Sequence, residues 1–236
     1  MTQEEFVAEL VKSVSRELCN PLTIIKTAVK LLQIPNLKPS QRQHYLLVIG
    51  EACERQNRLI QSLTELTTLK DVQEEATVPL VLADVVPAIV STYQPLAQEK
   101  GVMLAYTVPM SLPIWVGVPT LLRKIVVQLV DNALQATSSG GRIWLTVTAT
   151  ETHICLEVRD SGVGIPAEEI PKIFERFYRV PQRKGVGIGM GLTIVQQLVR
   201  QAHGEIAVQS EVGKGTCFQV RLPLDAELSS TVMTPM

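Results

Sequence analysis

Residues 128–137 read QLVDNALQAT, the stretch around which the second half of the chain is organised. The residues before it begin with Pro119, which suits the first turn of a helix because its missing N–H is not needed there. The sequence therefore predicts a strong helix over residues 119–137. Asn132, at the centre of the quoted stretch, is the first candidate for a polar functional site.

Three further motifs follow in order, each beside a predicted strand or helix. The stretch DSGVGI, residues 160–165, comes directly after an apolar strand. GIGMGL, residues 187–192, opens a helix, and GKGTCF, residues 213–218, enters a strand. Taken alone, each is more often a turn or a packing point than a binding site. Only the ordered set favours a binding site.

The residue types in these motifs suit a nucleotide. A buried carboxylate at Asp160 can accept a hydrogen bond from an exocyclic amine, which distinguishes adenine from guanine. Gly162 and Gly164 let the backbone approach the base closely. Asn132 offers a neutral oxygen to a Mg²⁺ ion already neutralised by phosphates. Bare backbone at a helix N-terminus favours phosphate, and the glycines that supply it here are Gly187, Gly189 and Gly191.

Two more helices are predicted in this mixed α and β region. Residues 83–101 look helical, with Pro87 near the first turn. Residues 191–204 form a second helix, which Gly204 ends as a C-cap.

Short strands are predicted for MLAYTV and for the residues around Trp115. Alternating apolar and polar residues predict a hairpin over residues 142–162, with its turn around Glu151 and Thr152. EIAVQS and CFQVRLPL form a closing hairpin. Residues 225–236 show no pattern and are expected to be a disordered tail.

The first 72 residues differ, because apolar residues follow heptads from Phe6 to Leu32 and again from Tyr45 to Leu66. Pro21 should kink the first helix. Residues 34–41 separate the two helices, with Ser40 as the expected N-cap of the second. Such a hairpin favours dimerisation into a four-helix bundle. The alternative is two ordinary core helices packed on the rest of the chain.

Residues 75–224 resemble the ATP-binding catalytic domain of sensor histidine kinases, the Bergerat fold shared with gyrase, Hsp90 and MutL. QLVDNALQAT resembles the N box, DSGVGI the G1 box, IFERFYR the F box, GIGMGL the G2 box and GKGTCF the following glycine box. Residues 1–72 resemble the family's dimerisation and phosphotransfer hairpin. The resemblance implies an α+β chain, with a hairpin that forms a dimeric four-helix bundle before an α/β sandwich domain at residues 73–224.

The resemblance also implies roles for individual residues. Asn132, with Gln128, would hold Mg²⁺, and Asp160 would read the adenine. Residues 174–187 would form a short ATP lid. Arg176 is a candidate to reach phosphate, although such loop cations are more often solvated. The remaining residues implied in ATP binding are Gly162, Gly164, Arg179, Lys184, Gly187, Gly189, Gly191, Leu192 and Thr216.

Two N-box positions depart from the family pattern. The family's first Asn is Gln128 here, and the related ATPases carry at this position a Glu that activates water. Gln cannot take a proton, so hydrolysis of the gyrase or chaperone kind is disfavoured. The usual Lys of the N box is Gln135, which removes one cation near the phosphates.

The stretch SRELCNPL, residues 15–22, resembles the family's SHELRTPL, with Arg16 at the position of the phospho-accepting histidine. A guanidinium stays protonated and offers no lone pair, so Arg16 should not accept a phosphoryl group. Glu17 and Asn20 lie three apart on one helical face, like the family's pair that supports dephosphorylation of a response regulator. Alternatively, Glu17 pairs along the helix and Asn20 accommodates Pro21.

Bulk composition excludes several classes. The net charge of −1 gives no basic surface for nucleic acid, and no apolar stretch is long enough for membrane insertion. An acidic N-terminus lacks the order of a signal peptide. The four cysteines are widely spread, so reduced thiols and a cytoplasmic location are expected. His44 and His153 lack any matching motif.

Three functions remain open. The first is a signalling protein that binds ATP and Mg²⁺, cannot autophosphorylate and acts on a response regulator receiver domain, as its phosphatase or as a titrating partner. The second is a kinase acting in trans, in a heterodimer with another histidine kinase, or an ordinary kinase with a substituted histidine. The third is a non-catalytic, nucleotide-binding scaffold. Serine kinases that inactivate sigma factors and mitochondrial-type dehydrogenase kinases share the ATP boxes but lack SxELxxPL.

Overall fold

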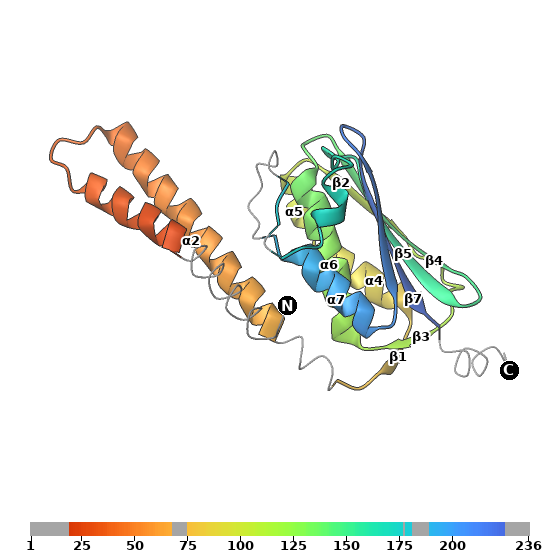
Figure 1. The fold of residues 1–236 in the computed structure, drawn as a ribbon. Coiled ribbons are helices and arrows are strands. Elements are labelled where there is room, and N and C mark those ends of the chain that lie inside the picture. Colours follow the sequence, from red (N-terminus) through yellow and green to blue (C-terminus); the bar gives the residue numbers. More distant parts are fainter. Residues whose placement is uncertain (1–18, 68–74, 177, 181–188, 225–236) are drawn as a thin grey trace. The chain divides into compact units, whose positions relative to one another are not determined.

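The computed structural model describes residues 19–67, 75–176, 178–180 and 189–224. The chain divides into two compact units, and the first unit ends at Leu66 where the second begins at Thr67. Figure 1 shows paired helices in the first unit and a sheet with helices packed on it in the second. Within the described ranges, no helix has both the length and the apolar content needed to cross a membrane. All four cysteines are free thiols.

The first unit is the predicted helical hairpin. Its first helix is described from residue 19 to residue 32, and α2 (Pro39–Thr67) returns alongside it. Ala28 and Ala52 are nearly fully buried, at 3% and 5% exposed, and such small side chains let two helices approach closely. The earlier part of the first heptad, from Phe6 to Leu18, lies outside the described residues, and the kink at Pro21 stays a prediction.

The expected N-cap at Ser40 is wrong. The helix α2 begins one residue earlier, at Pro39, whose fixed φ and missing N–H suit the first helical position. The backbone N–H of Lys38 donates to Oε1 of Gln41 at 3.2 Å. Gln41 therefore folds back on the residue before the helix, as the third residue of a capping box does.

The second unit is built on a five-stranded sheet. Its strands lie in the order β2 (Met103–Thr107), β4 (Arg142–Ala149), β5 (His153–Asp160), β7 (Gly215–Pro223) and β6 (Glu205–Glu211). The pair β2–β4 is parallel, and the other pairs are antiparallel. A separate two-stranded sheet joins β1 (Val78–Leu80), which sequence reasoning missed, to β3 (Trp115–Gly117).

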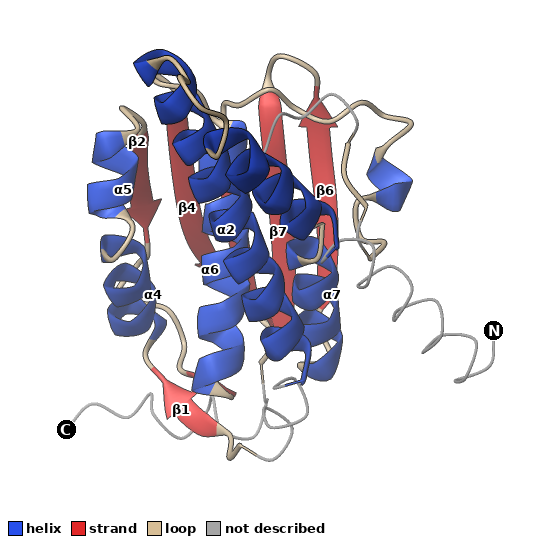
Figure 2. Cartoon of the chain, turned by 90° about the vertical axis from the view of Figure 1, so that its left-hand side faces the viewer, coloured by secondary structure: helices blue, strands red, loops and turns tan. Residues whose placement is uncertain are grey.

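Three helices, α4 (Leu82–Ser91), α6 (Pro119–Ala136) and α7 (Gly191–Gln201), lie on one face of the five-stranded sheet (Figures 1 and 2). The predicted helix that starts at Pro119 is confirmed. The core between helices and sheet is aliphatic, and its almost fully buried members include Ile125, Leu129, Ile143, Leu145, Ile154, Leu156, Ile194 and Leu198.

The predicted hairpin of β4 and β5 is confirmed, with its turn at Glu151 and Thr152. Alternate residues of both strands are buried, since successive side chains of a strand point to opposite faces. Asp160 is the last residue of β5 and pairs with Ile143. The hairpin therefore carries the DSGVGI motif to one end of the sheet.

The single helix expected over residues 83–101 is wrong. The structure has α4 (Leu82–Ser91) and then a short helix, α5 (Gln94–Glu99). Pro95 fits this break, because it has no N–H to donate to the preceding turn and it lies in the first turn of α5, where that N–H is not needed. Pro87 lies in the interior of α4, not in its first turn.

The expected C-cap at Gly204 is also wrong in detail. The helix α7 ends at Gln201, and the residue with left-handed backbone is His203, at φ 52°. The N–H of Gly204 donates to the carbonyl of Val199 at 2.8 Å, which closes a Schellman-type end. Gly204 is needed because an added Cβ would lie 2.3 Å from the carbonyl oxygen of Arg221.

Candidate functional site

Asp160 is a buried carboxylate held by backbone donors. It is 4% exposed. Its Oδ1 accepts hydrogen bonds from the N–H of Gly162 at 2.8 Å and from the N–H of Thr216 at 3.3 Å. These donors belong to the loop after β5 and to the start of β7, so the orientation of the carboxylate is fixed by two segments at once.

The glycine after Asp160 is required by close packing. A Cβ on Gly162 would lie 2.4 Å from the carbonyl oxygen of Ala136 and 2.8 Å from Oδ1 of Asp160. The same loop is bound to the end of α6, since the N–H of Val163 donates to that Ala136 carbonyl at 3.2 Å. The DSGVGI loop therefore lies directly against the end of the helix that carries Asn132.

Gln128 and Asn132 lie one turn apart on α6 and face the first residue of α7. A Cβ on Gly191 would lie 2.6 Å from Oε1 of Gln128 and 3.8 Å from Nδ2 of Asn132. That Nδ2 atom is buried and has no hydrogen-bond partner among the described residues. A buried donor without a partner is costly, so this atom indicates a position where a ligand oxygen would be stabilising.

The beginning of α7 presents backbone donors at the same place. Gly189 has a left-handed φ of 76°, and Met190 precedes the helix. The first N–H groups of an α-helix have no intrahelical partner, and the helix dipole makes that end attractive to anions. The N–H groups in question belong to Gly191, Leu192 and Thr193.

The segment around the IFERFYR motif is tied to α7. The hydroxyl of Thr193 donates to the carbonyl of Phe174 at 3.0 Å. Burial lowers the pKa of the Arg176 guanidinium from its ordinary value. Arg176 and Arg179 are both half-buried and both interact with other groups of the protein.

The structure thus gathers most of the predicted nucleotide residues at one end of the second unit. Asp160, Thr216 and the DSGVGI loop adjoin the end of α6, while Gln128 and Asn132 adjoin the start of α7. Lys184, Gly187, Arg16 and Glu17 lie outside the described residues. Asn20 is exposed on the first hairpin helix, far along the sequence from the ATP boxes.

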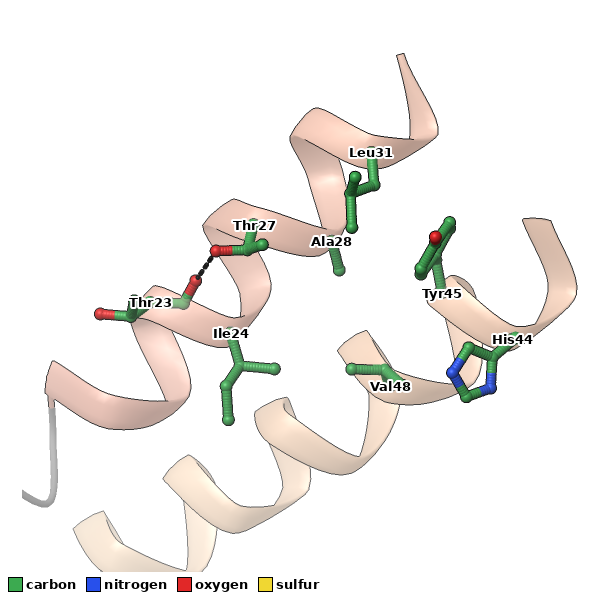
Figure 3. Close-up of a pocket in the computed structure, with 8 residues that line it drawn as sticks. All are labelled: Thr23, Ile24, Thr27, Ala28, Leu31, His44, Tyr45 and Val48. Carbon is green, nitrogen blue, oxygen red and sulfur yellow. Dashed lines mark hydrogen bonds between the residues drawn. The ribbon is translucent and has the colours of Figure 1, made fainter. Parts of the chain in front are cut away.

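A groove between the two hairpin helices measures about 290 Å³. Figure 3 shows its lining side chains, which come from both helices: Thr23, Ile24, Thr27, Ala28, Leu31, His44, Tyr45 and Val48. The hydroxyls of Thr23 and Thr27 donate to the carbonyls of Cys19 and Thr23, at 2.9 and 2.8 Å. The groove is therefore mainly apolar, with the exposed His44 at its edge.

Sequence reasoning missed Ser210 of β6. Its hydroxyl contacts three groups of the two glycine-rich loops, Ile165, Gly215 and Thr216. The signal available in the sequence was its position three residues before GKGTCF, but a serine in a predicted strand is unremarkable. Only the three-dimensional arrangement shows the contacts.

Comparison with known proteins identifies both units. Residues 6–71 match the His Kinase A (phospho-acceptor) domain, and residues 117–226 match the histidine kinase-, DNA gyrase B- and HSP90-like ATPase family. The adaptive-response sensory kinase SasA of Crocosphaera subtropica is 31% identical over 231 residues, which are 94% of this chain and 60% of that protein. This chain spans about half the length of two further relatives.

Two solved structures share the fold. The histidine kinase ThkA, in complex with the response regulator protein TrrA, superimposes with a TM-score of 0.77 over 96% of this chain and 64% of that chain, at 19% identity. Full-length ShkA in complex with AMPPNP gives a TM-score of 0.64 over 92% of this chain and 46% of that chain, at 23% identity.

The helical hairpin and the α/β unit follow one another along the chain in the same order as the two domain matches. This chain is a two-component sensor histidine kinase core: a phospho-acceptor-type hairpin followed by a histidine kinase-like ATPase domain.

Proposed function

We propose that the second unit binds ATP with Mg²⁺ between the DSGVGI loop, the end of α6 and the start of α7. The observation that carries the proposal is Asp160, a carboxylate 4% exposed whose Oδ1 is held by the N–H groups of Gly162 and Thr216. A carboxylate fixed in this way accepts the exocyclic amine of adenine and rejects the oxygen of guanine. ShkA, which shares this fold, was solved with AMPPNP.

The phosphates would lie toward Gly191. There the first N–H groups of α7 attract anions, and the unpartnered Nδ2 of Asn132 offers one more donor. The amide oxygens of Asn132 and Gln128 are the proposed side-chain ligands of Mg²⁺, and the ion would neutralise phosphate charge. Lys184 and Gly187 are proposed to complete the phosphate site, together with Arg179.

We further propose that this core does not autophosphorylate by the usual route. Transfer to the hairpin requires a nucleophilic lone pair at position 16, which a histidine provides near neutral pH. Arg16 has none, because its guanidinium stays protonated. The ATP site would then serve to set the conformation of the protein or to act on a histidine of another chain.

The partner proposed for the hairpin is a response regulator receiver domain. ThkA, the fold neighbour with the TM-score of 0.77, was solved with a response regulator protein. Asn20 is exposed on the hairpin, so its amide is available to position a water for attack on an aspartyl phosphate. Glu17, three residues earlier in the sequence, would complete the pair.

A second copy of the chain is the proposed cover for the hairpin. Large apolar side chains of the two helices and the turn between them are between 42% and 58% exposed: Leu22, Ile24, Val29, Ile34, Leu46, Leu47 and Ile60. A patch of this kind is stabilised by burial against another apolar surface. The proposal predicts that Leu47→Glu converts a dimer to a monomer in sedimentation equilibrium, while Gln43→Glu on the same helix leaves the dimer intact.

Phosphatase activity can be tested with receiver domains phosphorylated by acetyl phosphate. The whole chain should accelerate loss of the phosphate from at least one receiver of a panel, and Asn20→Ala should slow that loss about tenfold or more. Asn57→Ala, an exposed asparagine of α2, is the matched control. Equal rates for the wild type and Asn20→Ala would contradict the assigned role of the amide.

Transfer in trans is the second candidate, and the segments gathered around Asp160 and Asn132 favour it over a domain that no longer binds nucleotide. The buried carboxylate of Asp160, held by a backbone donor, and the unpartnered amide of Asn132 beside Gly191 support nucleotide binding. Mixing the chain with a histidine-bearing hairpin and γ-labelled ATP should label that hairpin. Without transfer of label, the trans hypothesis is wrong.

A further inference from the structure

Ser210 connects the two loops that enclose Asp160. It is half-buried on β6, and its Oγ accepts the backbone N–H of Ile165 at 2.8 Å. The same Oγ donates to the carbonyl of Gly215 at 2.9 Å. It also lies 2.9 Å from Oγ1 of Thr216, a contact in which either hydroxyl can donate.

The single hydroxyl proton of Ser210 decides which residue donates in the hydrogen bond between Ser210 and Thr216. A serine hydroxyl has one proton and two lone pairs. The carbonyl of Gly215 can only accept, so it takes the proton of Ser210, and the N–H of Ile165 occupies one lone pair. One lone pair remains, and the hydroxyl of Thr216 must therefore be the donor to Ser210.

This direction determines what Thr216 can offer a ligand. With its proton committed to Ser210, the Thr216 hydroxyl retains only lone pairs, so it can accept hydrogen bonds but cannot donate one. Its backbone N–H meanwhile donates to Oδ1 of Asp160 at 3.3 Å. Thr216 is 2% exposed, so water does not compete for its hydroxyl proton and change the direction of this hydrogen bond.

We propose that Ser210 is a positioning residue that makes Thr216 an acceptor beside Asp160 and thereby sharpens the preference for adenine over guanine. The proposal rests on nucleotide binding at this site. Adenine presents an amine where guanine presents an oxygen. The Asp160 carboxylate and the Thr216 hydroxyl would both only accept hydrogen bonds, so they favour the adenine amine. The guanine oxygen would find no donor there, and an unpaired buried polar group discriminates more strongly than a lost contact does.

The experiment compares ATP with GTP on the whole chain, each displacing the fluorescent analogue mant-ATP. Ser210→Ala should lower the ratio of the two affinities about tenfold, because Thr216 is then free to turn its proton toward the guanine oxygen. Ser210→Thr keeps a hydroxyl and should keep the wild-type ratio. Thr216→Val, which removes the hydroxyl itself, should lower the ratio as Ser210→Ala does.

Thr150→Ala is the matched control, because Thr150 also accepts a backbone N–H, that of His153 at 3.0 Å, but lies at the other end of the sheet. It should leave the ratio unchanged. If Ser210→Ala lowers thermal stability yet keeps the ATP to GTP ratio, Ser210 is only structural and the proposal is overturned. If the wild type binds neither nucleotide, the proposed function itself fails.

Discussion

Replacing Gly164 by alanine tests how tightly the DSGVGI loop packs on the hairpin of β6 and β7. Gly164 has φ +71°, and its added Cβ would lie 2.1 Å from the carbonyl oxygen of Glu211 and 2.9 Å from Cα of Val212. Both contacts are backbone atoms, which cannot turn away as the end of a side chain can. The loop or the hairpin must therefore move.

Gly213 provides a control with nearly the same backbone. Its φ is +79°, and an added Cβ would meet nothing within 4 Å. Both glycines lie where the DSGVGI loop meets the turn between β6 and β7, since the N–H of Gly213 donates to the carbonyl of Val163, the residue before Gly164, at 2.9 Å. Gly213→Ala therefore introduces the backbone strain without the collision.

The magnitudes separate the two variants. A non-glycine residue in the left-handed region costs about 1 kcal/mol or slightly more. Overpacking a closed site costs a further ~1–3 kcal/mol. Gly164→Ala should thus destabilise the second unit by about 3 kcal/mol, and Gly213→Ala by about 1 kcal/mol. These values correspond to losses in melting temperature of roughly 6–12 °C and 2–4 °C.

The assay is thermal unfolding followed by circular dichroism, with a mant-ATP titration below the transition. Gly164→Ala should melt clearly below Gly213→Ala and bind the analogue more weakly, because its loop carries Gly162, a donor to Asp160. Equal melting temperatures for the two variants would refute the packing argument. So would unchanged ATP binding in a strongly destabilised Gly164→Ala.

The remaining predictions concern single polar side chains. Asp160→Asn should keep the fold, since its oxygen still accepts from Gly162 and Thr216; isothermal titration should show ATP bound about 10–100-fold more weakly, because an NH₂ group replaces an acceptor. Gln128→Glu should introduce slow ATP hydrolysis, since a carboxylate accepts a proton and an amide does not; a phosphate-release assay that gives the wild-type value would contradict this. The hydrogen bond from Gln219 lowers the pKa of Glu157, with burial opposing it and Arg159 assisting. The ionised form therefore stabilises the fold above the unfolded pKa of about 4.3, and this contribution is lost as pH falls through the lower folded pKa. Between about pH 5 and pH 3, the wild type should lose more melting temperature than Glu157→Gln; parallel pH profiles would contradict the prediction.

Local chemistry in the sequence predicted much of the second unit. Pro119 marked the start of α6, and alternation marked the hairpin of β4 and β5. The wrong details were helix boundaries, of which one depends on a proline and another on a backbone contact. The break before α5 follows from Pro95, and the left-handed residue after α7 is His203 because Gly204 is needed against Arg221.

The candidate site shows a similar division. Asp160, Gly162 and Asn132 were predicted from motif order, and the structure brings their segments together, although their roles toward ATP stay predictions. Ser210 was missed, because its importance comes from contacts with Ile165 and Thr216 across two loops. The short strand β1 was missed as well, since three residues cannot show a period. The boundary between the units, expected at residue 72, also stays a prediction.

The function of the helical hairpin was harder to predict than its fold. Its heptads predicted two helices, which the described residues confirm. The residues that decide its chemistry, Arg16 and Glu17, lie outside the described part of the chain. Their assignment depends on the register of SRELCNPL and on the chemistry of guanidinium.

The most direct test of the central claim is incubation of the whole chain with γ-labelled ATP and Mg²⁺, followed by a denaturing gel, with an ATP titration on the same preparation. The account predicts that the protein binds ATP and stays unlabelled, since Arg16 cannot accept a phosphoryl group. A labelled band would contradict it, and mapping of the phosphorylated residue, beginning with His44, would then identify the acceptor.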